Sequence, residues 1–338
     1  MRWIMNTPNM TASEIGILWT QYLQNSMSLQ IVKYFNEIVE DTDIRLIVEQ
    51  TLQLTGKVNS EIEQFFQVEN IPTPDAFSES DVNLKAPRLY TDPFILWFIE
   101  TMGKASSTAY SLSQGVSSRT DIRAFFSKIL MEYSSLLNEA IDMGLTKGIY
   151  VRPPSITKPG QVEYITGKKY FSSGLNPFNK RTLNSVEIMH LSENLKTNAI
   201  GTLLCTGFAQ TTENKEVKKF FIDGKNISNK HVKIFSEKLS ETGLTAAISP
   251  DIGVTDSTTR VFSDKLMMFL KSVLSATGQG NYSTASTASM RYDLVADYQR
   301  LSAEIALYAK DGLDIMLKHG WLEEPPQAPD RKELIHSK

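Results

Sequence analysis

Apolar residues recur every three or four positions through eight long segments of the chain, which is the spacing of amphipathic α-helices. One stripe in the second of these segments, for example, consists of Ile44, Ile47, Leu54, Val58, Ile62 and Phe65. The first helix is predicted to begin at Thr11, because a hydroxyl at the cap and Glu14 three residues later form a capping box. The pattern therefore predicts an all-α protein.

The sequence contains an internal repeat, so that one unit occurs twice along the chain. Glu14-Ile15 reappears as Glu187-Ile188 at an offset of 173 residues, and the segment from Arg88 to Asp92 reappears from Arg260 to Asp264 at an offset of 172. The change from one offset to the other indicates a single insertion or deletion. Each repeat is therefore expected to have the same fold, with four helices.

The second and third helices of each repeat are joined by a long connection. In the first repeat it runs from about 71 to 91 and contains three prolines, so it is not helical. About 21 extended residues reach roughly 69 Å, whereas a helix of about 28 residues is only roughly 42 Å long. The connection can thus cross a whole bundle, which favours a ferritin-like four-helix bundle over an up-down-up-down bundle with short loops.

The predicted organisation is two such bundles in tandem, each with a long crossover between its second and third helices. The first is expected at residues 10–151 and the second at 183–328. The Pro- and Gly-rich segment 152–182 between them is interpreted as a linker that packs in part on the bundles.

Composition narrows the class of protein. The chain is 41% hydrophobic and 22% charged with a net charge of −3, and it has no basic stripe of the kind that binds nucleic acid. It also has no apolar run long enough for a membrane span or a signal peptide, so we expect a cytoplasmic or spore-associated protein. The single cysteine, Cys205, excludes a disulfide framework and is expected to be a small buried hydrophobic residue.

The crossover topology places a polar side chain from each helix of the second repeat near the middle of its bundle. Counting from the helix ends puts Asn198, His231, Tyr282 and Glu304 at similar heights. The equivalent residues of the first repeat are Asn25, Val58, Tyr110 and Glu132, so only the histidine is missing there.

Two interpretations of this polar layer stay open. His231 and Glu304 could ligate iron, manganese or zinc, but Ser228 and Leu307 occupy positions where a dinuclear carboxylate site needs glutamate and histidine. The alternative is a hydrogen-bonded structural layer in which Tyr, Asn and His satisfy the buried carboxylate. No other cofactor is predicted.

Glycines on the third helix of the second repeat, Gly278 and Gly280, also have two interpretations. They could permit close helix packing or a kink, or they could leave room for a small ligand beside Tyr282. No nucleophile with a placed base is evident, so the sequence favours a protein that is not an enzyme.

Several segments resemble an uncharacterised two-repeat, ferritin-like family of spore-forming bacteria that is similar to spore coat protein F. They are Thr11-Ala12-Ser13-Glu14-Ile15 with Trp19 and Tyr22, then residues 83–89, 148–154 and 263–269. The resemblance implies a ferritin-like bundle in each repeat and a link to spores, and it brings no catalytic residues. It also implies that His is frequent at the position of Val58, which sets the first repeat apart.

The combined expectation is a structural or interaction protein, linked to the spore coat, that folds without metal. Such a protein would bind protein partners or itself through an extended surface between the bundles. The rival expectation is a metal-binding protein with its site in the core of the second bundle.

Overall fold

The computed structural model describes residues 8–176, 180–245 and 252–336, and the regular structure in these residues is helical. The first half contains α1 (Ala12–Ile38), α2 (Thr42–Glu69), α3 (Asp92–Val116) and α4 (Thr120–Thr146). A short 3-10 helix, η1 (Glu79–Asp81), interrupts the connection between α2 and α3 and was not expected from the sequence. The prediction of an all-α protein is confirmed.

The second half repeats these helices almost residue for residue. It contains α6 (Ser185–Thr211), α7 (Lys215–Ser240), α8 (Asp264–Ala288) and α9 (Tyr292–Lys318). The segment between the halves includes the short helices α5 (Lys169–Ser172) and η2 (Ser173–Leu175), which pack near α9, and the chain continues to α10 (Arg331–His336). Consecutive helices pack as pairs, and the two pairs of each half contact each other.

A buried glutamate ties the start of each half to its far turn. Thr11 and Glu14 form the expected capping box at the start of α1, and Glu14 also accepts hydrogen bonds from the backbone N–H groups of Ser118 and Arg119 at 2.8 and 2.7 Å. Burial alone would raise the pKa of this carboxyl group, but the hydrogen bonds outweigh it and lower the pKa to about 2. Glu187 repeats the arrangement with the N–H groups of Met290 and Arg291.

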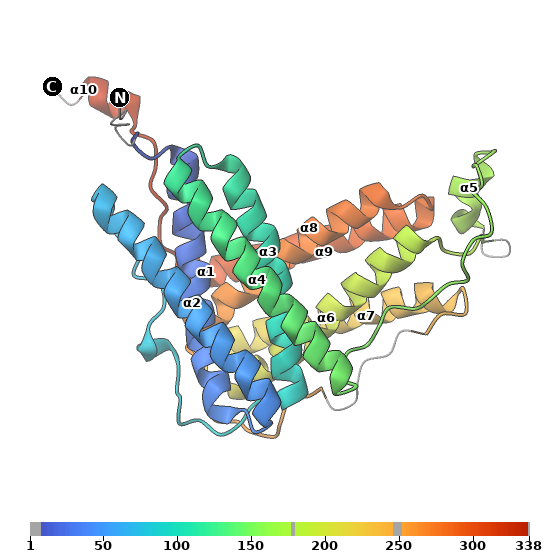
Figure 1. The fold of residues 1–338 in the computed structure, drawn as a ribbon, viewed down its shortest axis with the longest axis horizontal. Helices are drawn as coiled ribbons and strands as arrows, with labels where there is room; N and C mark the ends of the chain where they lie inside the picture. The colour runs from blue at the N-terminus through green and yellow to red at the C-terminus, as the bar shows by residue number, and fades with distance from the viewer. Residues whose placement is uncertain (1–7, 177–179, 246–251, 337–338) are drawn as a thin grey trace, which may run out of the picture.

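The connection after α2 runs back along the first half to the start of α3 (Figure 1). It meets the equivalent connection of the second half in antiparallel pairing, between Val82 and Phe262 and between Tyr90 and Val254. These two pairs exchange places under the repeat offset of 172. The two halves therefore meet through the same segment on each side, as the subunits of a twofold dimer do.

Backbone hydrogen bonds follow the same symmetry. The N–H of Asn83 donates to Val261 O at 2.7 Å, and its counterpart Thr255 donates to Leu89 O at 2.9 Å. Ser263 N–H donates to Asp81 O at 2.9 Å, and Thr91 N–H donates to Gly253 O at 3.1 Å. One hydrophobic core continues across this junction, with buried residues from both halves.

The symmetry is broken at one pair of aromatic positions. Tyr34 of α1 packs edge-on against Phe262, with ring centroids 5.4 Å apart. The residue equivalent to Tyr34 in α6 is Gly207, and Tyr90 fills the space that this glycine leaves. A Cβ atom at Gly207 would lie only 2.5 Å from Tyr90 Oη. The Tyr34–Phe262 contact therefore forms on one side of the junction, and the packing of Tyr90 on Gly207 forms on the other.

We therefore predict that Gly207→Ala lowers the free energy of unfolding by roughly 1–3 kcal/mol, the usual range for overpacking. An alanine in an open helical position would instead be stabilising. Tyr90→Phe removes the closest atom, so the double variant should recover part of the loss in urea unfolding. Gly16→Ala, where a Cβ has open space, is the matched control.

Candidate functional site

The four polar side chains expected in the second half meet in its interior. His231 is fully buried, and its Nδ1 lies 2.9 Å from Tyr282 Oη while its Nε2 lies 3.1 Å from Glu304 Oε2. Asn198 donates its amide N–H to Tyr282 Oη at 2.7 Å. The structure thus brings together one residue from each of α6, α7, α8 and α9.

The electrostatics of this cluster keep the histidine neutral. Burial lowers the pKa of His231, and the adjacent Glu304 carboxylate offsets this only in part. Glu304 is 29% exposed and also bonds Lys230 Nζ at 2.8 Å, and these partners hold its pKa below the usual range. The carboxylate is therefore shared between a surface lysine and the buried imidazole.

The first half has a different cluster at the same level. Asn25 accepts hydrogen bonds from Tyr110 at 3.1 Å and Tyr133 at 3.4 Å, and Tyr133 bonds Thr55 at 3.2 Å. Glu132 is about as exposed as Glu304, at 32% against 29% of the side chain. With Val58 in place of histidine, Glu132 has no hydrogen bond to this cluster among the described residues, and it pairs with Lys57 as Glu304 pairs with Lys230.

A metal ion in this cluster would need several side chains that are free to act as ligands. Among the residues that the structure describes, no group of three or more His, Cys, Asp or Glu side chains is placed to hold a metal ion. Both ring nitrogens of His231 already have protein partners, as do both carboxylate oxygens of Glu304. The arrangement serves as a closed hydrogen-bond network across four helices.

A large groove lies between the halves, on α1, α3 and α8. It has a volume of about 440 Å³ and is mostly apolar, and Asn25, Tyr110 and Tyr133 of the first cluster are among its lining residues. The C-terminal segment contributes Glu323 and Pro325 to it. Volumes of roughly 300–1,000 Å³ are typical of ligand sites.

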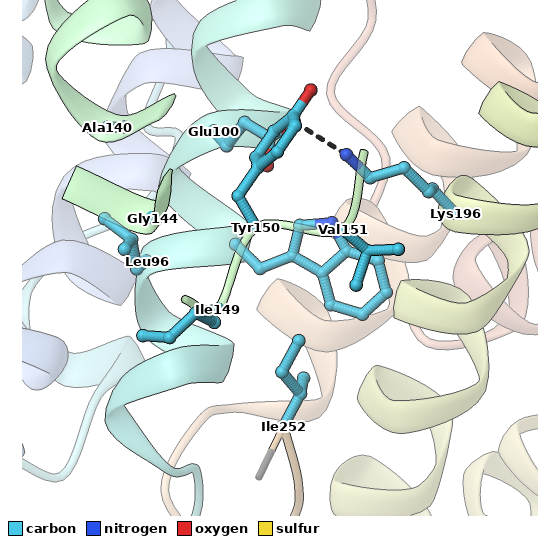
Figure 2. A pocket seen from close by; sticks show the side chains of 10 residues that line it. Leu96, Glu100, Ala140, Gly144, Ile149, Tyr150, Val151, Lys196 and Ile252 are labelled. Carbon is cyan, nitrogen blue, oxygen red and sulfur yellow. Dashed lines mark hydrogen bonds and ion pairs between the residues drawn. The ribbon is translucent and has the colours of Figure 1, made fainter. Parts of the chain in front are cut away.

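The equivalent place on the other side of the junction holds only a small pocket (Figure 2). Lys196 Nζ lies 3.0 Å from Glu100 and 4.3 Å from the centroid of the Tyr150 ring, and the dashed line in Figure 2 marks the ion pair with Glu100. A second pair, Lys104 and Glu193, is 2.7 Å apart. Two ion pairs therefore bridge α3 and α6 here.

Sequence reasoning missed both the groove and these ion pairs. A signal was present, because each charged residue on the closed side aligns with an uncharged residue on the open side. Lys196, Glu193, Glu100 and Lys104 correspond to Leu23, Thr20, Ser272 and Ala276, and all four of the uncharged residues line the groove. The two sides of one duplicated junction have diverged in charge.

These features define an all-helical protein made of two copies of one helical unit. The chain belongs to the family described as "Protein of unknown function (DUF3231)", which matches residues 1–162 and again residues 173–334. The two matches agree with the internal repeat.

No curated protein matches this chain. Among solved structures it is similar to a putative spore coat protein from Bacillus halodurans C-125, at 19% identity and a TM-score of 0.41, over 45% of this chain and 98% of that one. Across the described residues, no helix is long and apolar enough to cross a membrane.

Removing His231 should destabilise the second half. His231→Val leaves Tyr282 and Glu304 without their partner, and we expect a loss of roughly 1–3 kcal/mol in the free energy of unfolding. Adding Ile305→Tyr reproduces the Val58 and Tyr133 arrangement of the first half, so the double variant should recover part of this loss.

The pH dependence supplies a check on the same variants in urea unfolding. Because the folded pKa of His231 lies below its usual 6.5, its contribution is present above about pH 6.5 and is lost as the unfolded chain takes up protons below it. The gap between wild type and His231→Val should therefore narrow as the pH falls from 8 to 5. A gap that does not change with pH would contradict the neutral histidine.

Proposed function

We propose that this chain is a structural or interaction protein, built as two tandem ferritin-like four-helix bundles, that takes up an apolar helical segment of a partner protein in the groove between its halves. The link to the spore coat rests on the sequence resemblance. The observation that carries the proposal is the groove itself, which is open and apolar where the equivalent place is closed by ion pairs.

The lining of the groove suits a helix. Three long helices provide its walls, and large apolar side chains such as Trp19, Phe98 and Phe269 are available to hold apolar anchors. Small residues, Ala105 and Ala109 among them, allow a partner backbone to approach closely. Amphipathic helices bind such grooves through apolar residues spaced three and four apart.

The rival proposal is a metal-binding protein that uses His231 and Glu304. A metal ion would have to displace Tyr282 and Lys230 and break the His231–Glu304 contact. It would then have two protein ligands, His231 and Glu304, of the kind that iron, manganese or zinc needs. We favour the structural role for this cluster, and we propose that the protein has no catalytic activity.

The groove proposal is tested by giving the groove the charges of the closed side. The double variant Leu23→Lys/Ser272→Glu introduces the counterparts of Lys196 and Glu100. The hydrophobic dye anilinonaphthalene sulfonate should bind wild type at one saturable site and bind this variant at least tenfold more weakly. Leu112→Lys, which changes an exposed leucine outside the groove, should bind the dye as wild type does.

The biological arm uses the same three proteins in a sporulating host. Wild type and Leu112→Lys should be recovered with the coat fraction of purified spores, and the double variant should be released. Equal recovery of all three would contradict the groove as the partner site. Wild type that stays out of the coat fraction would remove the spore link, while the dye titration still tests the groove.

Elemental analysis of the purified, untagged protein separates the two proposals. We expect substoichiometric metal that is unchanged in His231→Ala. One metal ion per chain in wild type that is lost in the variant would instead establish the metal site.

A further inference from the structure

A separate cavity lies inside the second half, among α6, α7, α8 and α9. Its walls include Gly201, Gly224 and Gly278, and its volume of about 40 Å³ has room for about three water molecules. It also touches Asn198 and Tyr282 of the polar cluster. The sequence suggested Gly278 and Gly280 as candidates for a ligand pocket beside Tyr282. Gly278 lines this cavity, and Gly280 does not.

The cavity interrupts the core of the second half. Buried apolar residues on one side of it, such as Leu270, belong to the core shared by both halves, while those on the other side, such as Leu301, form a second cluster. In the first half no such division occurs among the described residues. The division of the core by this cavity is therefore specific to the second copy of the unit among the described residues.

Lys271 is the residue that makes this interior unusual. Lys271 is only 8% exposed, and its side chain lines the cavity. Its ammonium lies 5.2 Å from the centroid of the Tyr308 ring, and its charge offsets in part the rise that burial causes in the pKa of the Cys205 thiol. The equivalent residue in the first half is Ile99, so the charge is specific to the second copy.

A buried ammonium needs a compensating charge. Removing an ion from water costs several kcal/mol unless an opposite charge and hydrogen bonds replace the solvent. Within the described part of the chain, no carboxylate lies within the 4.0 Å of an ion pair with Lys271. The thiol and the aromatic ring offer only weak compensation.

The rest of the lining fits an anion with an apolar end. Ser228 and Ser275 bring hydroxyl groups that can donate hydrogen bonds, and each residue is only 5% exposed. Leu274 and Ile305 form an apolar wall. Ile227 and Tyr308 also line an open surface cleft, so these side chains separate the cavity from solvent on that side.

We propose that this cavity binds a small carboxylate of two carbons, with its charged group held by Lys271 and the serine hydroxyls and its methyl group against Leu274 and Ile305. The site is independent of the groove between the halves. It also argues against a metal cation in the same bundle core, because the unpaired ammonium would repel one.

Acetate is the probe for the test, applied to the whole protein. At constant ionic strength maintained with chloride, acetate should raise the unfolding midpoint of wild type by several degrees in a saturable manner. Lys271→Met keeps the length of the side chain and removes the charge, and its midpoint should not respond to acetate. Ile99→Met, the matched change in the first half, should respond as wild type does.

A second variant keeps the test decisive if Lys271→Met fails to fold. Ser275→Ala removes one hydroxyl and should weaken acetate binding roughly tenfold, since a hydrogen bond to a charged group is worth about 1.4 kcal/mol or more. Broadening of the carbon-13 signal of labelled acetate measures the binding directly. No response in wild type, or an equal response in Lys271→Met, would overturn the proposal.

Discussion

Pairing between the two crossover segments is the constraint on which the rest of this structure depends. Each segment lies against its counterpart through two backbone hydrogen bonds given and two received, so neither half presents an unpaired segment at the junction. A buried N–H or C=O without a partner costs free energy comparable to a lost hydrogen bond. The pairing therefore fixes the register of the two halves, and the shared core fills in around it.

Once both copies are in one chain, the two sides of such a junction are free to diverge. One side has the pairs Lys196–Glu100 and Lys104–Glu193, while the other has leucine, serine and alanine and is open. The interiors have diverged as well. The first half satisfies its cluster with tyrosine and threonine, whereas the second uses His231 and Glu304 and holds Lys271 beside an internal cavity.

Local features of the fold could be predicted from the sequence, because they depend on nearby residues. The capping box at Thr11 and Glu14, the helix periodicity and the repeat offsets all lie within short segments or follow from direct comparison of the copies. Helix counting also placed His231, Tyr282 and Asn198 at one level, since the rise per residue is constant. The partners of Glu132 could not be derived from the count, because they depend on what the opposite helix offers, and Val58 offers no hydrogen-bonding group. The groove and the pairing of the crossovers depend on how two distant segments meet, which periodicity does not encode.

Hydrogen exchange of four backbone amides tests the central claim most directly. The N–H groups of Asn83, Thr91, Thr255 and Ser263 lie in non-helical segments and would exchange quickly if the two halves were only tethered. If the paired crossovers hold the halves together, these amides should exchange slowly, with opening free energies close to those of the buried helices. Exchange as fast as that of exposed loop amides would contradict the account.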